Sequence, residues 1–175
     1  MIFRAESNED KWRLVLWLAG RLKEQPTDLV GQMPFEVAAV VKGGAIRGVV
    51  LYINYRGASI EMSCAGETGW LTRKALKAFF AYPFVQLKCR RVTGIVHRKN
   101  KRARDLNERL GFRLEGVCKH GFETGDAIIY GMTRAECRWI MERASTNGAS
   151  QRPASRKDSR RTLPQVDSTA HQQQI

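Results

Sequence analysis

The segment that most constrains the fold runs from residue 100 to residue 117. Ala103, Leu106 and Leu110 recur at a spacing that places them on one face of a helix. Gly111 follows at the position where a left-handed residue commonly ends a helix, and Phe112 begins an apolar stretch. The segment therefore predicts a helix over residues 100–110, and a strand from residue 112 whose first side chain plugs the core.

Local signals of the same kind predict the other elements. A helical period covers residues 8–23, with Ser7 or Asn8 as the cap, and residues 25–28 break it. Residues 35–42, 46–55 and 59–64 are typical of three strands, and Gly43-Gly44 is a hairpin signal between the first two. A helix over residues 70–82 ends at Pro83 and precedes a strand over 92–97. Strands over 112–118 and 126–133 and a helix from 134 to about 144 complete the domain.

This order of elements defines the expected fold class. Three antiparallel strands come first, and single strands and helices then alternate before a final strand pair. The pattern indicates an α/β (α+β) domain with a mixed central sheet flanked by helices, rather than a doubly wound parallel sheet.

The composition changes after residue 144. Ser, Gln, Arg, Thr and Pro dominate residues 145–175, and large apolar side chains almost vanish. Five of the 30 Lys and Arg residues of the chain lie there against Asp158 and Asp167, a net charge of +3. Such a segment buries too little apolar surface to offset its ordering entropy. We predict a domain over residues 1–144 and a basic, disordered tail over 145–175.

The segment 100–117 also resembles a known family pattern. It is similar to N-x-x-[AS]-x-x-[LV]-x-E-[KR]-x-G-F-x-x-E-G of the GNAT acetyltransferases, and most to the branch that modifies ribosomal-protein N-termini. The matching residues are Asn100, Ala103, Leu106, Glu108, Arg109, Gly111, Phe112, Glu115 and Gly116. The resemblance covers residues 2–135. It implies a GNAT fold, with a splay between parallel strands at 60–64 and 92–97, and direct transfer of acetyl from acetyl-CoA to a protein or peptide amine.

The resemblance implies that backbone amides hold the acetyl-CoA pyrophosphate where the central strand enters a helix, because helix N-termini attract anions. The candidate residues in this loop are Gly66, Thr68, Gly69, Trp70 and Leu71, with Thr68 as a possible helix cap. The loop departs from the family signature [QR]-x-x-G-x-[GA] in its glycine spacing, and Glu67 adds an unfavourable negative charge. A plain strand–loop–helix turn is the alternative interpretation.

A second candidate cofactor region is the basic run at residues 98–104. The resemblance places the ribose 3′-phosphate and adenine there, with Asn100 as a polar contact. The residues that we expect to bind the cofactor are Arg98, Asn100, Lys101 and Arg104. The alternative is a solvated helix face.

Two residues are candidates for the catalytic chemistry. Glu61 is a candidate base for the incoming ammonium, directly or through water, and its alternative is a surface or ion-paired carboxylate. Many family members have a Tyr as the acid for the leaving thiolate where this chain has Asn107, a departure that also occurs in the branch that modifies N-termini. We do not expect Cys64 to be a nucleophile, because nothing near it in sequence would lower its pKa.

Two other functions remain open. One is a catalytically inactive GNAT-like protein with a structural or binding role, because the size, basic tail and loose motifs are similar to GNAT-like proteins of tailed bacteriophages, some of them virion-associated. Its partner would be a phage or host protein. The other is nucleic-acid binding, suggested by the net charge of +13. The sequence has no recognisable nucleic-acid-binding motif, so we do not expect nucleic acid as the primary partner.

The remaining expectations concern location and metals. No signal peptide or membrane span is visible, so we expect a cytoplasmic protein with no membrane partner. The four cysteines form no CxxC pair, and the three histidines have no ligand spacing. We expect reduced thiols and no metal site.

Overall fold

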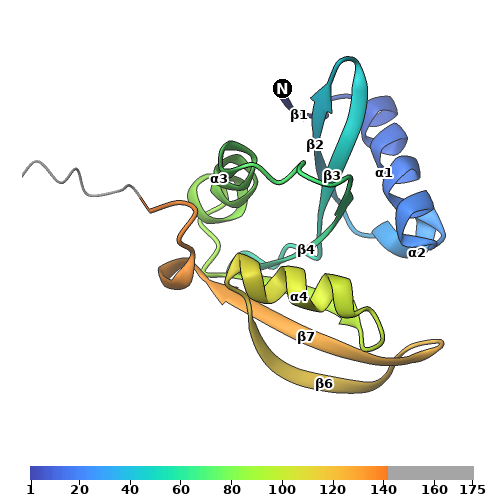
Figure 1. The fold of residues 1–175 in the computed structure, drawn as a ribbon, viewed down its shortest axis with the longest axis vertical. Helices are drawn as coiled ribbons and strands as arrows, with labels where there is room; N and C mark the ends of the chain where they lie inside the picture. Colours follow the sequence, from blue (N-terminus) through green and yellow to red (C-terminus); the bar gives the residue numbers. More distant parts are fainter. Residues whose placement is uncertain (142–175) are drawn as a thin grey trace, which may run out of the picture. The chain divides into compact units, whose positions relative to one another are not determined.

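The computed structural model describes residues 1–141, which form a mixed sheet with helices on both faces (Figure 1). The predicted domain end at residue 144 and the predicted tail over 145–175 lie outside the described residues.

Seven strands form one sheet in the order β1-β2-β3-β4-β5-β7-β6. Their bounds, from β1 to β7, are Ile2–Arg4, Glu36–Lys42, Ala45–Ile53, Ser59–Gly66, Arg91–His97, Arg113–Phe122 and Gly125–Thr133. Every neighbouring pair is antiparallel except β4 and β5, which are parallel. The predicted fold class, a mixed sheet with an antiparallel meander and one parallel pair, is confirmed.

The turn between β2 and β3 sets the register of the meander. Gly43 and Gly44 both have a positive φ, of 60° and 74°. Two residues in this conformation give a hairpin turn whose twist matches that of the flanking strands. Lys42 pairs with Ala45 directly across the turn. The hairpin predicted from the two glycines is confirmed.

The helices divide between the two faces of the sheet. The helices α1 (Asn8–Leu22) and α2 (Pro26–Val30) lie on one side of the meander, and α3 (Arg73–Ala81) lies on the other (Figure 1). The helix α4 (Lys101–Leu110) shares a buried core with α3 and the inner faces of β5 and β7. A second core lies between α1, α2 and the opposite face of β2 and β3. The sheet is therefore covered on both sides over its N-terminal half.

The junction after α4 follows the prediction. Gly111 has a φ of 103°, and its N–H donates to the carbonyl oxygens of Asn107 and Glu108, which ends the helix. Phe112 is buried, and its ring lies 6.0 Å from the ring of Phe80 on α3, centroid to centroid. This residue thus joins α4 to the core shared with α3.

Three local features differ from the predictions. The strand β1 and the helix α2 were not predicted, because β1 has only three residues and Pro26, taken as a breaker, occupies the first turn of α2. The helix α3 begins at Arg73 rather than residue 70, because Thr72 caps it. Pro83 does not directly end the helix α3, whose last residue is Ala81. It lies instead in a π-helical turn over Tyr82–Gln86 that follows α3.

The helix predicted from residue 134 to about 144 is wrong over residues 134–141. Only a 3₁₀ turn forms, at Arg134–Glu136, and Cys137 is extended with a φ of −76° and a ψ of 92°. The Trp139 indole N–H donates to the carbonyl oxygen of Leu110 at 2.8 Å, and Cys137 is fully buried. These contacts with the end of α4 override the local helical tendency of the segment.

Candidate active site

The parallel strands β4 and β5 separate partway along their length. They pair only through Ser59 with Arg91, Ile60 with Val92 and Glu61 with Thr93. Beyond Glu61, β4 continues to Gly66 beside β3, and beyond Thr93, β5 continues to His97 beside β7. The central splay implied by the family resemblance is therefore present, and it opens toward the carboxyl ends of both strands.

The open end of the splay carries both predicted cofactor segments. The loop that follows β4 leads into α3, and the turn that follows β5 leads into α4. The carboxyl ends of parallel strands meet at the same edge of a sheet, where ligands of open α/β sheets commonly bind. Two helix N-termini thus lie at this edge, and the first amides of a helix have no acceptor within the helix.

The loop after β4 is shaped by Trp70. A Cβ on Gly48 would lie 2.1 Å from the Trp70 ring, and a Cβ on Gly66 would lie 2.4 Å from it. The indole is 8% exposed and belongs to the core beside Phe79, with ring centroids 5.7 Å apart. Gly66 is thus explained by close packing of an aromatic side chain. The Trp70 indole itself lies in the core, so its side chain is not exposed to a cofactor, and its backbone N–H donates to the Glu67 carbonyl oxygen at 3.4 Å.

The cap of α3 differs from the one predicted. The Thr72 hydroxyl oxygen accepts a hydrogen bond from the Ala75 amide at 3.2 Å, and Thr72 is the N-cap. Thr68 was the predicted cap and instead lies in the preceding loop. Gly69 has a φ of 80°, which favours glycine, and it lets this loop turn toward Leu71.

The negative charge of Glu67 is compensated. Its carboxylate lies 2.7 Å from the Arg47 guanidinium on β3 and 3.5 Å from the Arg21 guanidinium on α1. The hydrogen bond from Arg47 is the main cause of the lowered pKa of Glu67. The repulsion that the sequence suggested between Glu67 and a bound phosphate is therefore offset by two cations.

At the start of α4 the predicted residues have structural partners. The Asn100 side-chain oxygen accepts from the Ala103 amide at 3.0 Å, so Asn100 is the N-cap. Arg98 pairs with Asp126 at 2.9 Å, and Lys101 pairs with Asp105 at 2.6 Å. Hydrogen bonds from Arg98 and Lys101 lower the pKa of Asp126 and of Asp105, respectively.

The other cations of this run differ in their contacts. The Arg104 guanidinium donates to the Arg98 carbonyl oxygen at 3.3 Å. Among residues 1–141, Lys99 and Arg102 are in no ion pair. The run is a mixture of free and paired cations at the rim of the splay.

The two candidate catalytic residues flank the splay from opposite faces. Glu61 occupies the last paired position of β4, and its carboxylate makes no hydrogen bond or ion pair within the described part of the chain. Asn107 lies over β5 on the α4 side, where its Oδ1 is 3.0 Å from the position of a Cβ on Gly94. The Asn107 amide nitrogen donates to the Ala103 carbonyl oxygen at 2.9 Å.

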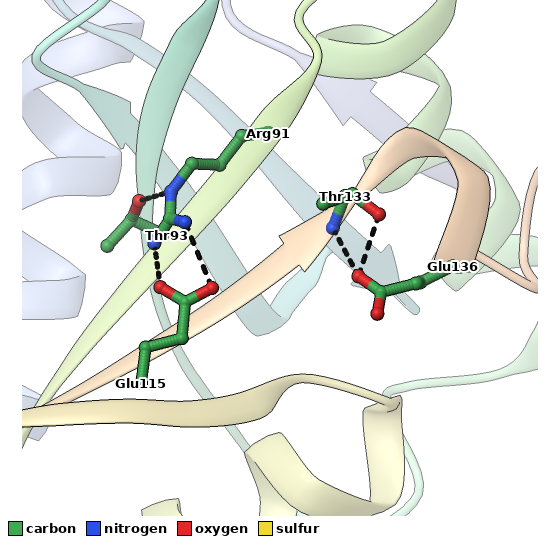
Figure 2. Close-up of polar contacts among 5 residues, drawn as sticks. All are labelled: Arg91, Thr93, Glu115, Thr133 and Glu136. Atoms are coloured by element: carbon green, nitrogen blue, oxygen red, sulfur yellow. Dashed lines mark hydrogen bonds and ion pairs between the residues drawn. The ribbon is translucent and has the colours of Figure 1, made fainter. Parts of the chain in front are cut away.

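A polar cluster beside Glu61 was not predicted from the sequence (Figure 2). The Arg91 Nε donates to the Thr93 hydroxyl oxygen at 3.1 Å, and both terminal nitrogens of Arg91 donate to the Glu115 carboxylate, one of them at 2.9 Å. Alternation along β5 places Arg91 and Thr93 on one face, and Glu115 belongs to the family-like segment. The alternation along β5 and the family-like match at Glu115 are both visible in the sequence. Neither shows that Arg91 and Glu115 pair, because the two residues lie on strands that are far apart in sequence.

The chemistry of Cys64 agrees with its sequence context. Burial raises the pKa of the Cys64 thiol to about 11. The thiol therefore stays protonated at neutral pH, and a protonated thiol is a poor nucleophile.

Within residues 1–141, no helix is long and apolar enough to cross a membrane, and no three acidic, His or Cys side chains gather as metal ligands.

Comparison with known proteins identifies the fold. No protein-family model and no curated protein sequence matches the chain. Solved structures do match it. A variant of spermidine N-acetyltransferase SpeG from Vibrio cholerae has a TM-score of 0.61 at 16% identity, over 79% of this chain and 97% of the other.

Two further structures belong to acetyltransferases with different names. N-acetyltransferase PseH from Campylobacter jejuni, in complex with acetyl coenzyme A, has a TM-score of 0.53 at 17% identity, over 77% of this chain and 99% of the other. Ribosomal-protein-S5-alanine acetyltransferase from Vibrio fischeri has a TM-score of 0.50 at 17% identity, over 59% and 64%. At these identities the likeness shows a shared fold, which is the fold of the GNAT acetyltransferases.

Proposed function

We propose that this chain is an acetyl-CoA-dependent N-acyltransferase that moves an acetyl group directly to an amine. The observation that carries the proposal is the separation of β4 from β5 after Glu61 and Thr93, with a helix N-terminus following each strand at the open end. Structural neighbours named as acetyltransferases, one of them with acetyl coenzyme A bound, support this use of the fold.

The residues at the open end fit the phosphates of acetyl-CoA. The caps bond the Ala75 amide of α3 and the Ala103 amide of α4, and the Lys101 N–H donates to the Lys99 carbonyl oxygen. The remaining first-turn amides, of Arg73 and Lys74 in α3 and of Arg102 in α4, have no acceptor within their helices and can attract an anion. Lys99 and Arg102 add cations, and the exposed pairs of Arg98 and Lys101 cost little to open. We assign the pyrophosphate to the backbone of Gly66, Thr68, Gly69, Trp70 and Leu71. We assign the 3′-phosphate and adenine to Arg98, Lys101 and Arg104, with Asn100 holding the start of α4.

The reaction follows from the position of Glu61. Acetyl-CoA supplies the activated acyl group as its thioester. Beyond Glu61, β4 stays paired with β3 but has lost β5, so only those amides of β4 that point away from β3 are left without a strand partner. One of them can donate to the thioester carbonyl and stabilise the developing negative charge. The half-buried Glu61 carboxylate takes a proton from the acceptor ammonium, directly or through water, and the free amine then attacks the thioester carbon. The C–S bond breaks as the amide forms, CoA leaves as its thiolate, and the second proton of the amine passes to water, which can return it to the thiolate. Asn107 can orient the thioester from the α4 side but cannot protonate the leaving thiolate.

We propose a protein or peptide amine as the acceptor. The support is the match of residues 100–117 to the pattern of the branch that modifies ribosomal-protein N-termini. The solved neighbours carry the names of different acceptors, spermidine and the alanine of a ribosomal protein.

The alternative is a catalytically inactive protein of the same fold, with a structural or binding role such as association with a virion and a phage or host protein as partner. One observation favours it: the Asn107 amide replaces a proton donor, and its nitrogen is already bonded to Ala103. Such a protein would fold as this one does and transfer no acetyl group.

Mass spectrometry of acceptor amines incubated with acetyl-CoA tests the proposal. The acceptors are spermidine and short peptides that begin with alanine or serine. We expect acetylation of at least one peptide, and a rate about 100-fold lower for Glu61→Gln, which is the scale of lost general-base catalysis. No acetylated product with any acceptor would favour the inactive alternative.

A further inference from the structure

We propose that Glu115 is a positioning residue: it holds the Arg91 guanidinium away from Glu61, so that the Glu61 carboxylate remains free to accept a proton. The role of Glu61 as a base rests on the proposed function. The structural part of the inference concerns only the position of the Arg91 guanidinium and does not depend on activity. Neither Arg91 nor Glu115 is assigned contact with the substrates.

The strand register brings the three side chains of β4 and β5 together. Glu61 is paired with Thr93, and Arg91 lies two residues before Thr93 on β5. Residues two apart on a strand point to the same face, and residues paired across neighbouring strands share that face. Arg91, Thr93 and Glu61 therefore lie in one corner of one face, opposite α3 and α4.

The polar groups of Arg91 are already committed. Its Nε donates to the Thr93 hydroxyl oxygen, and its two terminal nitrogens donate to the two oxygens of Glu115 (Figure 2). This is a bidentate ion pair between a guanidinium and a carboxylate, whose two parallel hydrogen bonds fix the orientation of both groups. No donor of Arg91 is directed to Glu61 in any hydrogen bond between residues 1–141.

The backbone is shaped to place Glu115 there. The register of β6 against β7 shifts between Leu114 and Gly116, so Glu115 is the extra residue of a bulge. Its carboxylate lies directly over Gly131 of β7, where a Cβ would be 2.0 Å from the Glu115 Oε1. A bulge re-aims a side chain, and Gly131 leaves the space that this side chain occupies.

Several other charged groups on the elements around this corner are paired elsewhere. On α1, which packs over β4, Lys11 pairs with Glu36 and Arg21 pairs with Glu67. On β6, Arg113 pairs with Glu136. Ile53, the β3 partner of Glu61, is uncharged. Arg91 is thus the cation that the loss of Glu115 would release beside Glu61.

A carboxyl titration tests the inference without requiring activity. In protein labelled with ¹³C at the glutamate carboxyl carbons, the Glu61 signal is assigned from its absence in Glu61→Gln. In Glu115→Gln, Arg91 becomes free to pair with Glu61, and an opposite charge within reach favours the ionised carboxylate. We expect the titration midpoint of Glu61 to fall by about one pH unit relative to the parent protein.

Two further variants identify the cause. Arg91→Gln combined with Glu115→Gln removes the released cation, so we expect the midpoint to return to the parent value. Glu136→Gln is the matched control, because Glu136 pairs with Arg113 on the same sheet, bonds Thr133 and lies in the separate cluster of Figure 2. We expect it to leave the Glu61 midpoint unchanged. An unchanged midpoint in Glu115→Gln, or a shift that persists in the double variant, overturns the inference.

Acetyl transfer by the same variants separates this inference from the proposed function. With an active parent protein, we expect kcat/KM to fall about tenfold in Glu115→Gln and to recover most of that loss in the double variant, because a carboxylate paired with a cation is a weaker base. A lost rate that the double variant does not recover contradicts the positioning role. An inactive parent protein that still shows the titration shift refutes the proposed function and leaves the position of Arg91 established.

Discussion

At the scale of single residues, the packing of Trp70 requires glycine at two neighbouring positions, Gly48 and Gly66. Its indole packs so closely against Gly48 and Gly66 that an added methyl group at either position would overlap the ring. We predict that Gly48→Ala lowers the free energy of unfolding by about 1–3 kcal/mol, the usual cost of overpacking a core. Urea denaturation followed by tryptophan fluorescence measures the change.

The control for this prediction is Gly116→Ala. Gly116 is also a strand glycine, but nothing lies within 4 Å of the position of its Cβ. We expect its free energy of unfolding to stay within about 0.5 kcal/mol of the parent value. Equal losses in the two variants would mean that the substitution of a strand glycine, and not the Trp70 contact, decides the stability.

The thiols provide a residue-scale prediction about pH. Burial raises the pKa of Cys64 to about 11, so its reactive thiolate is scarce below that pH. Cys118 is exposed on β6. We predict that iodoacetamide at pH 8 modifies Cys118 well before Cys64, and that the rate at Cys64 rises as the pH approaches 11. Peptide mapping by mass spectrometry follows both sites, and a faster reaction of Cys64 at pH 8 would show an activated thiol.

At the scale of elements, the start of α4 carries the prediction for the cofactor. We predict the effect of replacing four cations together by Gln: Arg98, Lys99, Lys101 and Arg104. The dissociation constant of CoA should rise at least fivefold and that of dephospho-CoA much less, because only CoA has the 3′-phosphate. Each exposed charge contact contributes up to about 1 kcal/mol, so the combined change is measurable where single changes are small. Competition binding gives both dissociation constants.

Dephospho-CoA is the internal control for this comparison, and the melting temperature of the variant checks that the fold remains, since Arg104 also bonds the Arg98 carbonyl oxygen. An equal loss for both ligands would place the 3′-phosphate elsewhere. If the same variant instead loses binding to DNA or RNA, the basic run serves nucleic acid.

The elements show which parts of the fold the sequence could predict. The helix before Gly111 and the Gly43-Gly44 hairpin depend on local signals, and both are present. The segment after Thr133 has local helical character, but Trp139 bonds the end of α4 and the helix does not form. Contacts between distant segments decided that outcome, and no local pattern reports them.

The candidate site shows the same division. The splay and the two helix starts at its open end were predicted, because they follow from the order of elements and the match over residues 100–117. The packing of Trp70 on Gly48 and the pairing of Arg91 with Glu115 were not, because each joins side chains on strands or loops that are far apart in the chain. Periodicity shows which face a side chain lies on, but not which partner it meets there.

At the scale of the whole molecule, the described residues 1–141 all belong to one compact unit. Buried side chains extend to Cys137, which is fully buried. We predict that deletion of residues 145–175 changes the melting temperature by less than about 3 °C, the shift that 1 kcal/mol produces in a domain of this size. Circular dichroism of the two chains tests this, and a fall of more than about 10 °C would show that the tail contributes to the folded core.

Calorimetry with acetyl-CoA tests most directly the central claim that the splay between β4 and β5 is a cofactor site. We predict saturable binding of one acetyl-CoA per chain and a matching rise in melting temperature, because a ligand of the native state stabilises it. Leu71→Pro, which removes a backbone N–H from the proposed phosphate loop without changing charge, should weaken binding. Neither heat nor a melting shift at millimolar acetyl-CoA would contradict the account.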